Sequence, residues 1–123
     1  MISKKRKYRD IKFTRLVVNI DIIGCSAHLR NNNKTIGSCK WEIQNKGDMY
    51  ISDFGIEDKY QGKGYGNFLA RIVIDLAKLY HLKTIYLIDG AIPEGFWQQL
   101  GFKTKFLYKN KVKVDTGNVE LKL

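Results

Sequence analysis

The sequence predicts a mixed α/β (α+β) fold in a single domain that spans residues 1–123. Stretches rich in β-branched and aromatic residues fill most of the first 56 positions, which is typical of strands. Between Gly66 and Tyr80 the apolar period changes to that of a helix. A chain of 123 residues of which 44% are apolar can also build one hydrophobic core without metal or disulfide staples.

The N-terminal third predicts strands joined by tight turns. Ile11–Ile23 is rich in Val, Ile, Phe and Thr, with polar residues interspersed. This composition indicates one long strand or two strand pieces, and Gly24 ends the segment. Cys25–Arg30 and Thr35–Ile43 are predicted to form a hairpin. Residues 31–34 close it, because asparagine tolerates left-handed backbone geometry.

The central part predicts a strand followed by an amphipathic helix. Residues 45–48 indicate a turn and Met49–Ile56 a strand. From Gly66 to Tyr80 the apolar residues form one continuous helical face, made of Leu69, Ile72, Val73, Leu76, Ala77 and Tyr80. The opposite face is charged and holds Arg71, Asp75 and Lys78.

The C-terminal part predicts three strands and a short helix. Thr84–Ile88 has the length and composition of a buried strand. A short helix over Pro93–Leu100 is expected to begin with proline in its first turn and to stop at Gly101. Residues 102–108 and 118–123 indicate two last strands. Because a strand precedes the long helix and another follows it, the helix is expected to form a crossover connection between them.

The net charge of +10 is concentrated at the two ends of the chain. Residues 1–12 carry +5, residues 103–123 carry +4, and the part between them carries +1. One interpretation is an electrostatic footprint for an anionic partner such as nucleic acid or a phosphorylated substrate. The alternative is a basic end that frays over residues 1–9, together with lysines that discourage edge pairing of the last strands.

The two cysteines, Cys25 and Cys39, match no zinc pattern. They could face each other across the predicted hairpin, but two small, half-buried thiols in a reducing compartment are the favoured interpretation. No metal constellation is expected. Because we find neither a membrane-spanning apolar run nor a secretory signal, the expected location is the cytoplasm.

The segment Gln61-Gly62-Lys63-Gly64-Tyr65-Gly66 lies between the predicted strand and the predicted long helix. Glycines remove the side chains that would keep a ligand away from the backbone. Amide groups at a helix N-terminus attract a phosphate, and Lys63 can add a point charge. The spacing fits neither a P-loop nor a dinucleotide fingerprint. A purely structural turn remains the alternative.

Together with a second segment, these residues resemble the GNAT superfamily of N-acetyltransferases. That family has a Gln/Arg-x-x-Gly-x-Gly/Ala motif before its central helix, which Gln61, Gly64 and Gly66 fill. About thirty residues later it often has Phe-Tyr-x-x-Leu-Gly-Phe, and residues 96–102 read Phe-Trp-Gln-Gln-Leu-Gly-Phe. The resemblance covers about residues 49–108. It implies a GNAT-like, mainly antiparallel sheet with a central helix, a short second helix and N-terminal helices that are reduced or absent.

The resemblance also implies a site for acetyl-CoA as cosubstrate, with no metal. The glycine segment would cradle the pyrophosphate, and the end of the preceding strand would pair with the pantetheine amides. The implied binding residues are Phe54, Gly55, Ile56, Gln61, Gly62, Lys63, Gly64, Tyr65, Gly66, Asn67 and Phe96. The helices that usually wall the acceptor site are missing from the pattern, which suggests an open site or one completed by a second subunit.

The chemistry needs a base for the acceptor amine and a group that eases departure of the thiolate. Asp53, within the predicted strand Met49–Ile56, and Asp89, at the end of the next predicted strand, are the candidate bases. Where the family often has a tyrosine acid, this chain has Trp97, whose indole N–H can only donate a hydrogen bond. A tyrosine elsewhere is an alternative, with the candidates being Tyr50, Tyr65 and Tyr86.

Three functions follow from the sequence. The first is acetylation of a primary amine, carried by a small molecule such as an amino sugar phosphate or polyamine, or by a protein. The second is a basic nucleic-acid-binding or protein-binding module on a catalytically weak scaffold of this type. The third is an acyl-CoA sensor without turnover. A homodimer is compatible with each of these.

Overall fold

The computed structural model describes residues 6–7, 11–13, 16–45, 47–88 and 95–123, with side chains from residue 18 onward. The elements follow the predicted mixed order, and they are β1 (Arg6–Lys7), β2 (Ile11–Phe13), β3 (Leu16–Ile23), β4 (Ser26–Asn31), β5 (Lys34–Gln44), β6 (Asp48–Ile56), η1 (Asp58–Tyr60), α1 (Tyr65–Leu79), β7 (Thr84–Ile88), α2 (Phe96–Gln99), β8 (Lys103–Lys109) and β9 (Val112–Lys122). The strands form a sheet in the order β1-β3-β4-β5-β6-β7-β9-β8, with β2 paired to β3.

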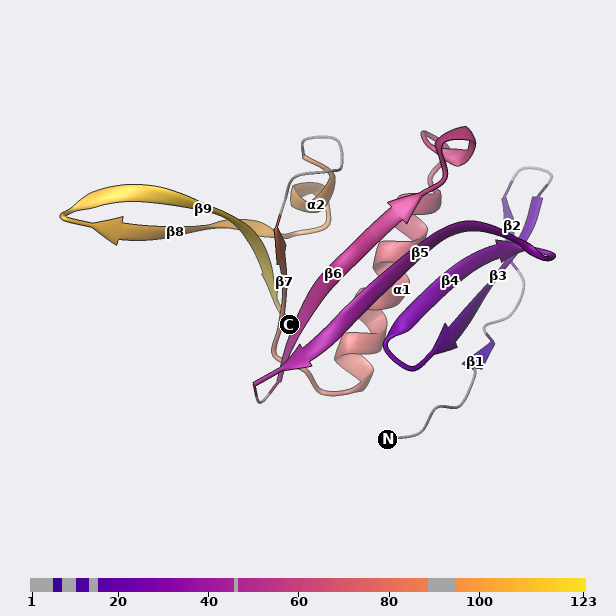
Figure 1. Ribbon diagram of the computed structural model, residues 1–123, viewed down its shortest axis with the longest axis horizontal. Helices are drawn as coiled ribbons and strands as arrows, with labels where there is room; N and C mark the ends of the chain where they lie inside the picture. The colour runs from indigo at the N-terminus through magenta and orange to yellow at the C-terminus, as the bar shows by residue number, and fades with distance from the viewer. Residues whose placement is uncertain (1–5, 8–10, 14–15, 46, 89–94) are drawn as a thin grey trace.

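The sheet is antiparallel except at one place, where β6 and β7 run parallel. Parallel neighbours need a crossover, and α1 supplies it. Figure 1 shows α1 behind β4, β5 and β6, so the helix covers one face of the sheet. We call the opposite face the bare face, because no helix of the described chain lies over it. From Ile11 to Gln44, residues 14–15 aside, the structure has strands and turns only. This agrees with the expectation that the family's N-terminal helices are reduced or absent in this chain.

The N-terminal strands follow the sequence prediction closely. The segment Ile11–Ile23 consists of two pieces, since β2 folds back antiparallel onto β3, and Gly24 turns the chain with a φ of 58°. The predicted hairpin is β4–β5, and Asn32 in its turn has a left-handed φ of 53°. Arg6–Lys7 pairs with β3, so this part of the predicted frayed end belongs to the sheet.

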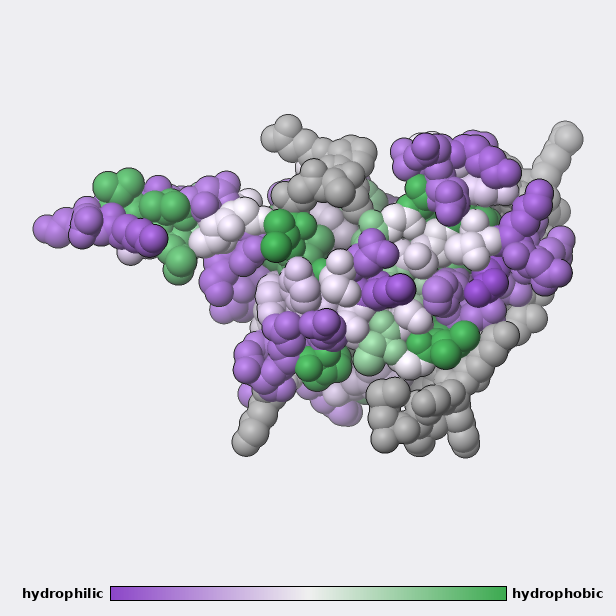
Figure 2. All heavy atoms as spheres, viewed as in Figure 1, coloured by the Kyte–Doolittle hydropathy of each residue, from purple (hydrophilic) through white to green (hydrophobic). Residues whose placement is uncertain are grey.

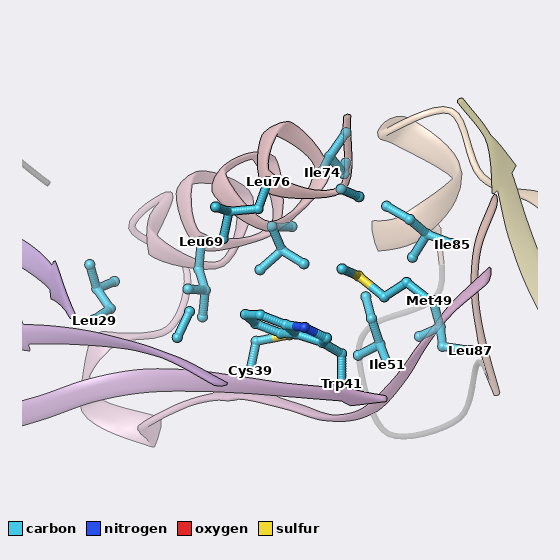
Figure 3. Close-up of a cluster of buried hydrophobic side chains, with 14 of the residues drawn as sticks. Leu29, Cys39, Trp41, Met49, Ile51, Leu69, Ile74, Leu76, Ile85 and Leu87 are labelled. Atoms are coloured by element: carbon cyan, nitrogen blue, oxygen red, sulfur yellow. The ribbon is translucent and has the colours of Figure 1, made fainter. Parts of the chain in front are cut away.

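The hydrophobic core lies between the sheet and α1 (Figure 3). On the predicted apolar face of α1, Leu69, Val73, Leu76 and Ala77 are buried, whereas Tyr80 is 46% exposed because it follows the last helical residue. The charged side of the helix is exposed as predicted. From the strands, the residues packed against α1 include Leu29, Cys39, Trp41, Met49, Ile51, Ile85 and Leu87.

The second helix is shorter than the sequence predicts. α2 begins at Phe96, after Gly95 with a φ of 87°, whereas Pro93 lies outside the described residues. Its end is as predicted: Gly101 has a φ of 100°. The Gly101 amide donates to the Gln98 carbonyl at 3.0 Å and the Phe102 amide to the Trp97 carbonyl at 3.1 Å. These two bonds form a Schellman motif, which satisfies the last carbonyls of the helix.

The two C-terminal strands form a longer hairpin than the sequence predicts. β9 starts at Val112 rather than at residue 118. Asn110 and Lys111 connect it to β8 with left-handed φ angles of 50° and 65°, as in a tight type I′ turn. The outer part of this β8–β9 ribbon projects from the body of the molecule (Figure 1).

The two cysteines do not face each other across the hairpin. The register places Ala27 opposite Cys39, while the Cys25 carbonyl accepts a hydrogen bond from the Trp41 amide at 3.0 Å. Both thiols are free, and Cys39 is buried. The favoured interpretation of two separate thiols is therefore confirmed.

We expect Leu76→Ala to lower the free energy of unfolding by about 2–5 kcal/mol, because the substitution opens a cavity in a closed core. Leu76 has no exposed surface. Urea unfolding followed by circular dichroism measures the change. Asp75→Ala, one residue away on the exposed side of α1, is the control and should stay within about 0.5 kcal/mol of the wild type.

Candidate active site

The site is built around a fork between β6 and β7. The two strands pair only where Asp48–Tyr50 lies beside Thr84–Tyr86. Beyond Tyr50, β6 continues to Ile56 with β5 on one side only. The backbone at Phe54–Ile56 therefore has an open edge on the β7 side, to which an extended chain of amide groups can add as a further strand.

A bulge in β6 decides which side chains face the core at this fork. The register passes from Trp41 opposite Ile51 to Lys40 opposite Asp53, so Ser52 is an extra residue. Its hydroxyl donates to the Lys40 carbonyl at 3.3 Å. Because a bulge shifts the alternation by one residue, Phe54 lies on the α1 side together with Ile51. Asp53 lies opposite Lys40 on the bare face.

The open edge of β6 borders a pocket of about 420 Å³. Three chain segments meet here: the end of β6, the glycine segment with the start of α1, and α2. The lining residues are uncharged, and they are Phe54, Gly55, Ile56, Gln61, Gly62, Gly64, Gly66, Asn67, Phe96 and Gln99. A pocket of this size, free of carboxylates in its described lining, suits an anionic ligand with an extended arm.

The start of α1 points amide groups at this pocket. Gly64 occupies the N-cap position with a φ of 90°, and no side chain caps the helix. The first helical hydrogen bond is donated by Phe68 to the Gly64 carbonyl at 3.1 Å. The amides of Gly66 and Asn67 precede that bond, so they are not used within the helix. An anion at this place could take the role that a Ser or Asp side chain has in ordinary helices.

At each of the three glycine positions of this segment, a different physical constraint favours glycine over other residues. Gly62 and Gly64 have φ angles of 74° and 90°, in the left-handed region that glycine adopts without strain. A Cβ on Gly66 would lie 3.3 Å from Cε1 of Phe96, so a side chain there would crowd the pocket wall. The backbone at these three positions is thus unsuited to side chains, and its role as a cradle for a pyrophosphate stays a prediction.

Gln61 ties this loop to the end of β6. Its Nε2 donates to the Ile56 carbonyl at 2.9 Å and lies 3.3 Å from an Asp58 carboxylate oxygen. This bond positions the loop beside the open edge. Of the other residues predicted in the cradle, Lys63 is exposed and Tyr65 is buried against Tyr60, and neither lines the pocket. Gln99 lines it although the sequence did not single it out; it lies one helical turn after Phe96.

Aromatic rings form the wall between the pocket and the core. The Phe54 ring centroid lies 5.6 Å from that of Phe96 and 4.9 Å from that of Trp97. Trp97 also packs edge-on against Phe96 and Phe102 and is only 1% exposed. Trp97 thus packs behind Phe54 and Phe96, on the core side of the wall. Its role as a hydrogen-bond donor to sulfur stays a prediction.

Asp53 lines a second, smaller groove on the other side of β6. This groove has a volume of about 250 Å³ and includes Ser38, Glu57 and Asp58. It shares Gly55 and Ile56 with the first pocket, and no atom lies within 4 Å of where a Gly55 Cβ would be. The two cavities are therefore neighbours across a strand without a side chain at position 55. The other candidate base, Asp89, lies outside the described residues.

Two tyrosines close the base of the fork. Tyr50 and Tyr86 are the last pair between β6 and β7, and their ring centroids are 5.1 Å apart. Tyr86 donates a hydrogen bond to Gln44. Partial burial and then the Asp48 carboxylate raise the pKa of Tyr86.

Cys39 of β5 lies opposite Phe54 of β6, and its side chain is fully buried. Burial, helped by the nearby Asp53 carboxylate, raises the pKa of the Cys39 thiol to about 12. The thiolate is the reactive form of cysteine, and almost none is present near pH 7. The full burial and the raised pKa of Cys39 both disfavour a covalent acyl intermediate on its sulfur.

The forked sheet, the crossover helix without a side-chain cap and the glycine-lined pocket together define an acyltransferase. A family model described as "Acetyltransferase (GNAT) family" matches residues 6–102, so the chain belongs to the GNAT acetyltransferase family. This confirms the resemblance on which the sequence prediction rests. No curated protein matches the chain significantly.

Solved structures share the fold at low sequence identity. An IAA acetyltransferase from Bacillus cereus is 16% identical with a TM-score of 0.64, over 80% of this chain and 77% of that one. A GNAT family acetyltransferase from Elizabethkingia anophelis with acetyl-CoA bound is 19% identical with a TM-score of 0.63, over 80% and 75%. The ribosomal-protein-S18-alanine N-acetyltransferase from Escherichia coli is 17% identical with a TM-score of 0.60, over 80% and 66%.

The described residues hold no group of three or more His, Cys, Asp or Glu residues placed to bind a metal ion. Their helices include none that is both long and apolar enough to cross a bilayer.

We expect iodoacetamide at pH 8 to modify Cys39 at least about a thousandfold more slowly in the folded protein than in urea. At a pKa of about 12 only about one thiol in ten thousand is ionised at that pH, against roughly a quarter of ordinary thiols. Site-resolved mass spectrometry measures both rates. Modification of native Cys39 within minutes would contradict its assignment as an inert core thiol.

Proposed function

We propose that the protein transfers the acetyl group of acetyl-CoA to a primary amine. The observation that carries the proposal is the pocket that joins the open edge of β6 to the uncapped start of α1. Backbone amides near Gly62–Asn67 would hold the pyrophosphate, and Phe54–Ile56 would pair with the pantetheine arm. The thioester supplies an activated acetyl group, and a backbone amide near Ile56 would stabilise the oxyanion.

Asp53 is the proposed base for the acceptor amine. A lysine-like amine must lose a proton first, which costs roughly 4–5 kcal/mol at pH 7. Asp53 lies in the groove that borders the coenzyme pocket across Gly55, so an amine in that groove would have a carboxylate beside it. The amine proton would go to Asp53 directly or through one water molecule.

Tyr50, at the base of the fork, is the proposed donor to the departing sulfur in place of the family's usual tyrosine, because the hydroxyl of Tyr86 already donates to Gln44. A coenzyme A thiol of ordinary pKa leaves acceptably as thiolate, so one hydrogen bond from the Tyr50 phenol would suffice.

The acceptor is a small amine or a protein amine, and the bare face of the sheet leaves room for either. A cytoplasmic location is part of the proposal and is supported by the two free thiols. Binding of nucleic acid at the basic ends stays a prediction, checked by gel-shift affinity that falls steeply with salt.

A second candidate is a coenzyme-binding protein with little or no turnover. The observation that favours it is Trp97, which stands in the position of a catalytic tyrosine and is buried in the wall. A thiol-release assay with acetyl-CoA and a panel of amines separates the two functions. Release above the rate of hydrolysis with at least one amine supports transfer.

We expect Gly64→Val to abolish detectable acetyl-CoA binding in calorimetry. A valine would strain the loop and hold the pyrophosphate away from the amides. Gly117→Val is a matched control, because Gly117 also has a left-handed φ, of 76°, but lies on β9 away from the pocket. The control should lose similar stability and keep wild-type affinity. Unchanged affinity in Gly64→Val would refute the cradle.

We expect Asp53→Asn to lower kcat by about 100-fold or more while the KM for acetyl-CoA changes less than about threefold. The variant should also lose the acidic limb of the pH–rate profile, since no carboxylate is left to be protonated. Asp75→Asn, on the far side of α1, is the control. A variant with the pH profile and rate of the wild type would remove Asp53 as the base.

A further inference from the structure

The guanidinium group of Arg71 is held at the rim of the coenzyme pocket. Side chains of a helix lean toward its N-terminus, and Arg71 reaches back one turn along α1 to Asn67. Its Nε donates a hydrogen bond to Oδ1 of Asn67 at 2.7 Å, and Asn67 lines the pocket. The bond therefore fixes a cation beside a pocket whose own described lining is uncharged.

The rest of the guanidinium group is available to a ligand. The bond to Asn67 uses only the Nε–H, so both terminal nitrogens keep their hydrogen-bond donors. Within the described ranges, no carboxylate forms a salt bridge with Arg71, and the residue is exposed. A guanidinium group in this state binds a phosphate through two parallel hydrogen bonds. Arg71 is thus oriented to bind an anionic group close to the pocket.

A groove of about 330 Å³ continues from the coenzyme pocket along α1. The pocket ends at Asn67 and Gln99, and the groove includes Arg71, one turn later on α1, and Leu100, the residue after Gln99. Asn67, Arg71 and Lys78 are four and seven residues apart, so they lie on one side of the helix. A ligand that leaves the pocket between α1 and α2 therefore enters the groove at Arg71.

The groove is cationic, whereas the pocket lining is uncharged. The charged side chains of the groove are three cations and one carboxylate, which gives a net charge of +2, and they are Arg71, Asp75, Lys78 and Lys122. A cationic groove attracts negative charge. A ligand that occupies both cavities is therefore expected to carry a second anionic group, beyond the one at the start of α1.

We propose that Arg71, positioned by Asn67, binds the phosphate on the ribose of coenzyme A and selects coenzyme A over the same molecule without that phosphate. This inference rests on the proposed function. Coenzyme A has a diphosphate and, on the adjoining ribose, a 3′-phosphate. With the diphosphate at the amides of Gly66 and Asn67, the ribose follows immediately outside the pocket. Arg71 lies about 6 Å farther along the helix axis than Asn67, a distance that one ribose can span.

Lys78 is a poorer candidate for the same phosphate. It lies about 10 Å beyond Arg71 along the helix axis, and Asp75 comes between them on the helix. Its ammonium group is a point charge on a flexible stem, whereas the fork of Arg71 is already oriented by Asn67. The phosphate is therefore assigned to the end of the groove that meets the pocket.

The alternative is that the pair Asn67–Arg71 only supports the helix, as polar pairs four residues apart do. A structural role stabilises the protein equally whichever coenzyme is bound. The ratio of the affinities for two coenzymes that differ only in the 3′-phosphate therefore separates binding of this phosphate from structural support.

Calorimetry of the full chain with coenzyme A and with 3′-dephospho-coenzyme A tests the proposal without any acetyl transfer. We expect the wild type to bind coenzyme A at least about tenfold more tightly, as for a charge-assisted hydrogen bond. Arg71→Gln should weaken binding of coenzyme A about tenfold and leave the Kd of the dephospho form within about twofold. The unchanged affinity for the dephospho form also shows that the variant is folded.

Two charge-matched variants serve as controls. Lys109→Gln removes one positive charge from the β8–β9 ribbon, which Figure 2 shows projecting from the body of the molecule. Lys78→Gln removes one from the groove itself, beyond the assigned phosphate position. Both variants should keep at least about a fivefold preference for coenzyme A, because exposed charges about 10 Å or more apart are largely screened at physiological salt.

Equal affinity of the wild type for the two coenzymes would overturn the inference, while coenzyme binding by the pocket, and with it the proposed function, would stand. A preference that survives in Arg71→Gln, or one that is lost in either control, would also overturn it. Absence of binding with both coenzymes would refute the proposed function itself and, with it, this inference.

Discussion

The short parallel pairing of β6 with β7 is the constraint on which the rest of the molecule depends. It joins Asp48–Tyr50 to Thr84–Tyr86 and then ends. If the pairing continued, Phe54–Ile56 would be an interior part of the sheet and no edge would be open. Because the strands are parallel, the chain between them must cross over as α1. The same requirement brings the start of α1 to the end of β6, so the open edge and the free amides arise together.

The extra residue Ser52 divides the neighbourhood of β6 into two chemically different sides. On the α1 side, Phe54 joins an aromatic wall and the pocket lining is uncharged. On the bare face, Asp53 lies in a groove with two further carboxylates. A strand with regular alternation would have placed Asp53 toward α1, where a carboxylate would be costly to bury. One inserted residue thus separates an environment suited to phosphate from one suited to an amine.

The sequence predicted those parts of the structure that local patterns determine. The period of Leu69, Val73 and Leu76 located α1 to within a residue. The resemblance to the GNAT family, carried by two short motifs, implied nine of the ten residues that line the pocket. What it missed depends on partners distant in the chain. The Ser52 bulge exists only relative to β5. The β8–β9 turn uses Lys111 with a left-handed φ, where a glycine would have announced a hairpin, so the first half of β9 was read as loop. Gln99 could not be assigned to the pocket from the sequence, because its place in the lining depends on where α2 packs.

The glycine at the N-cap of α1 has a consequence for how the protein behaves in a cell. Without a capping side chain, the first turn of the crossover helix lacks roughly a few tenths of a kcal/mol, the margin by which Ser or Asp at the N-cap exceeds glycine. In the proposed complex, an anion bound there would replace that contribution and stabilise the folded state by RT ln(1 + [L]/Kd). Resistance of the chain to unfolding and proteolysis would then rise with the concentration of that anion.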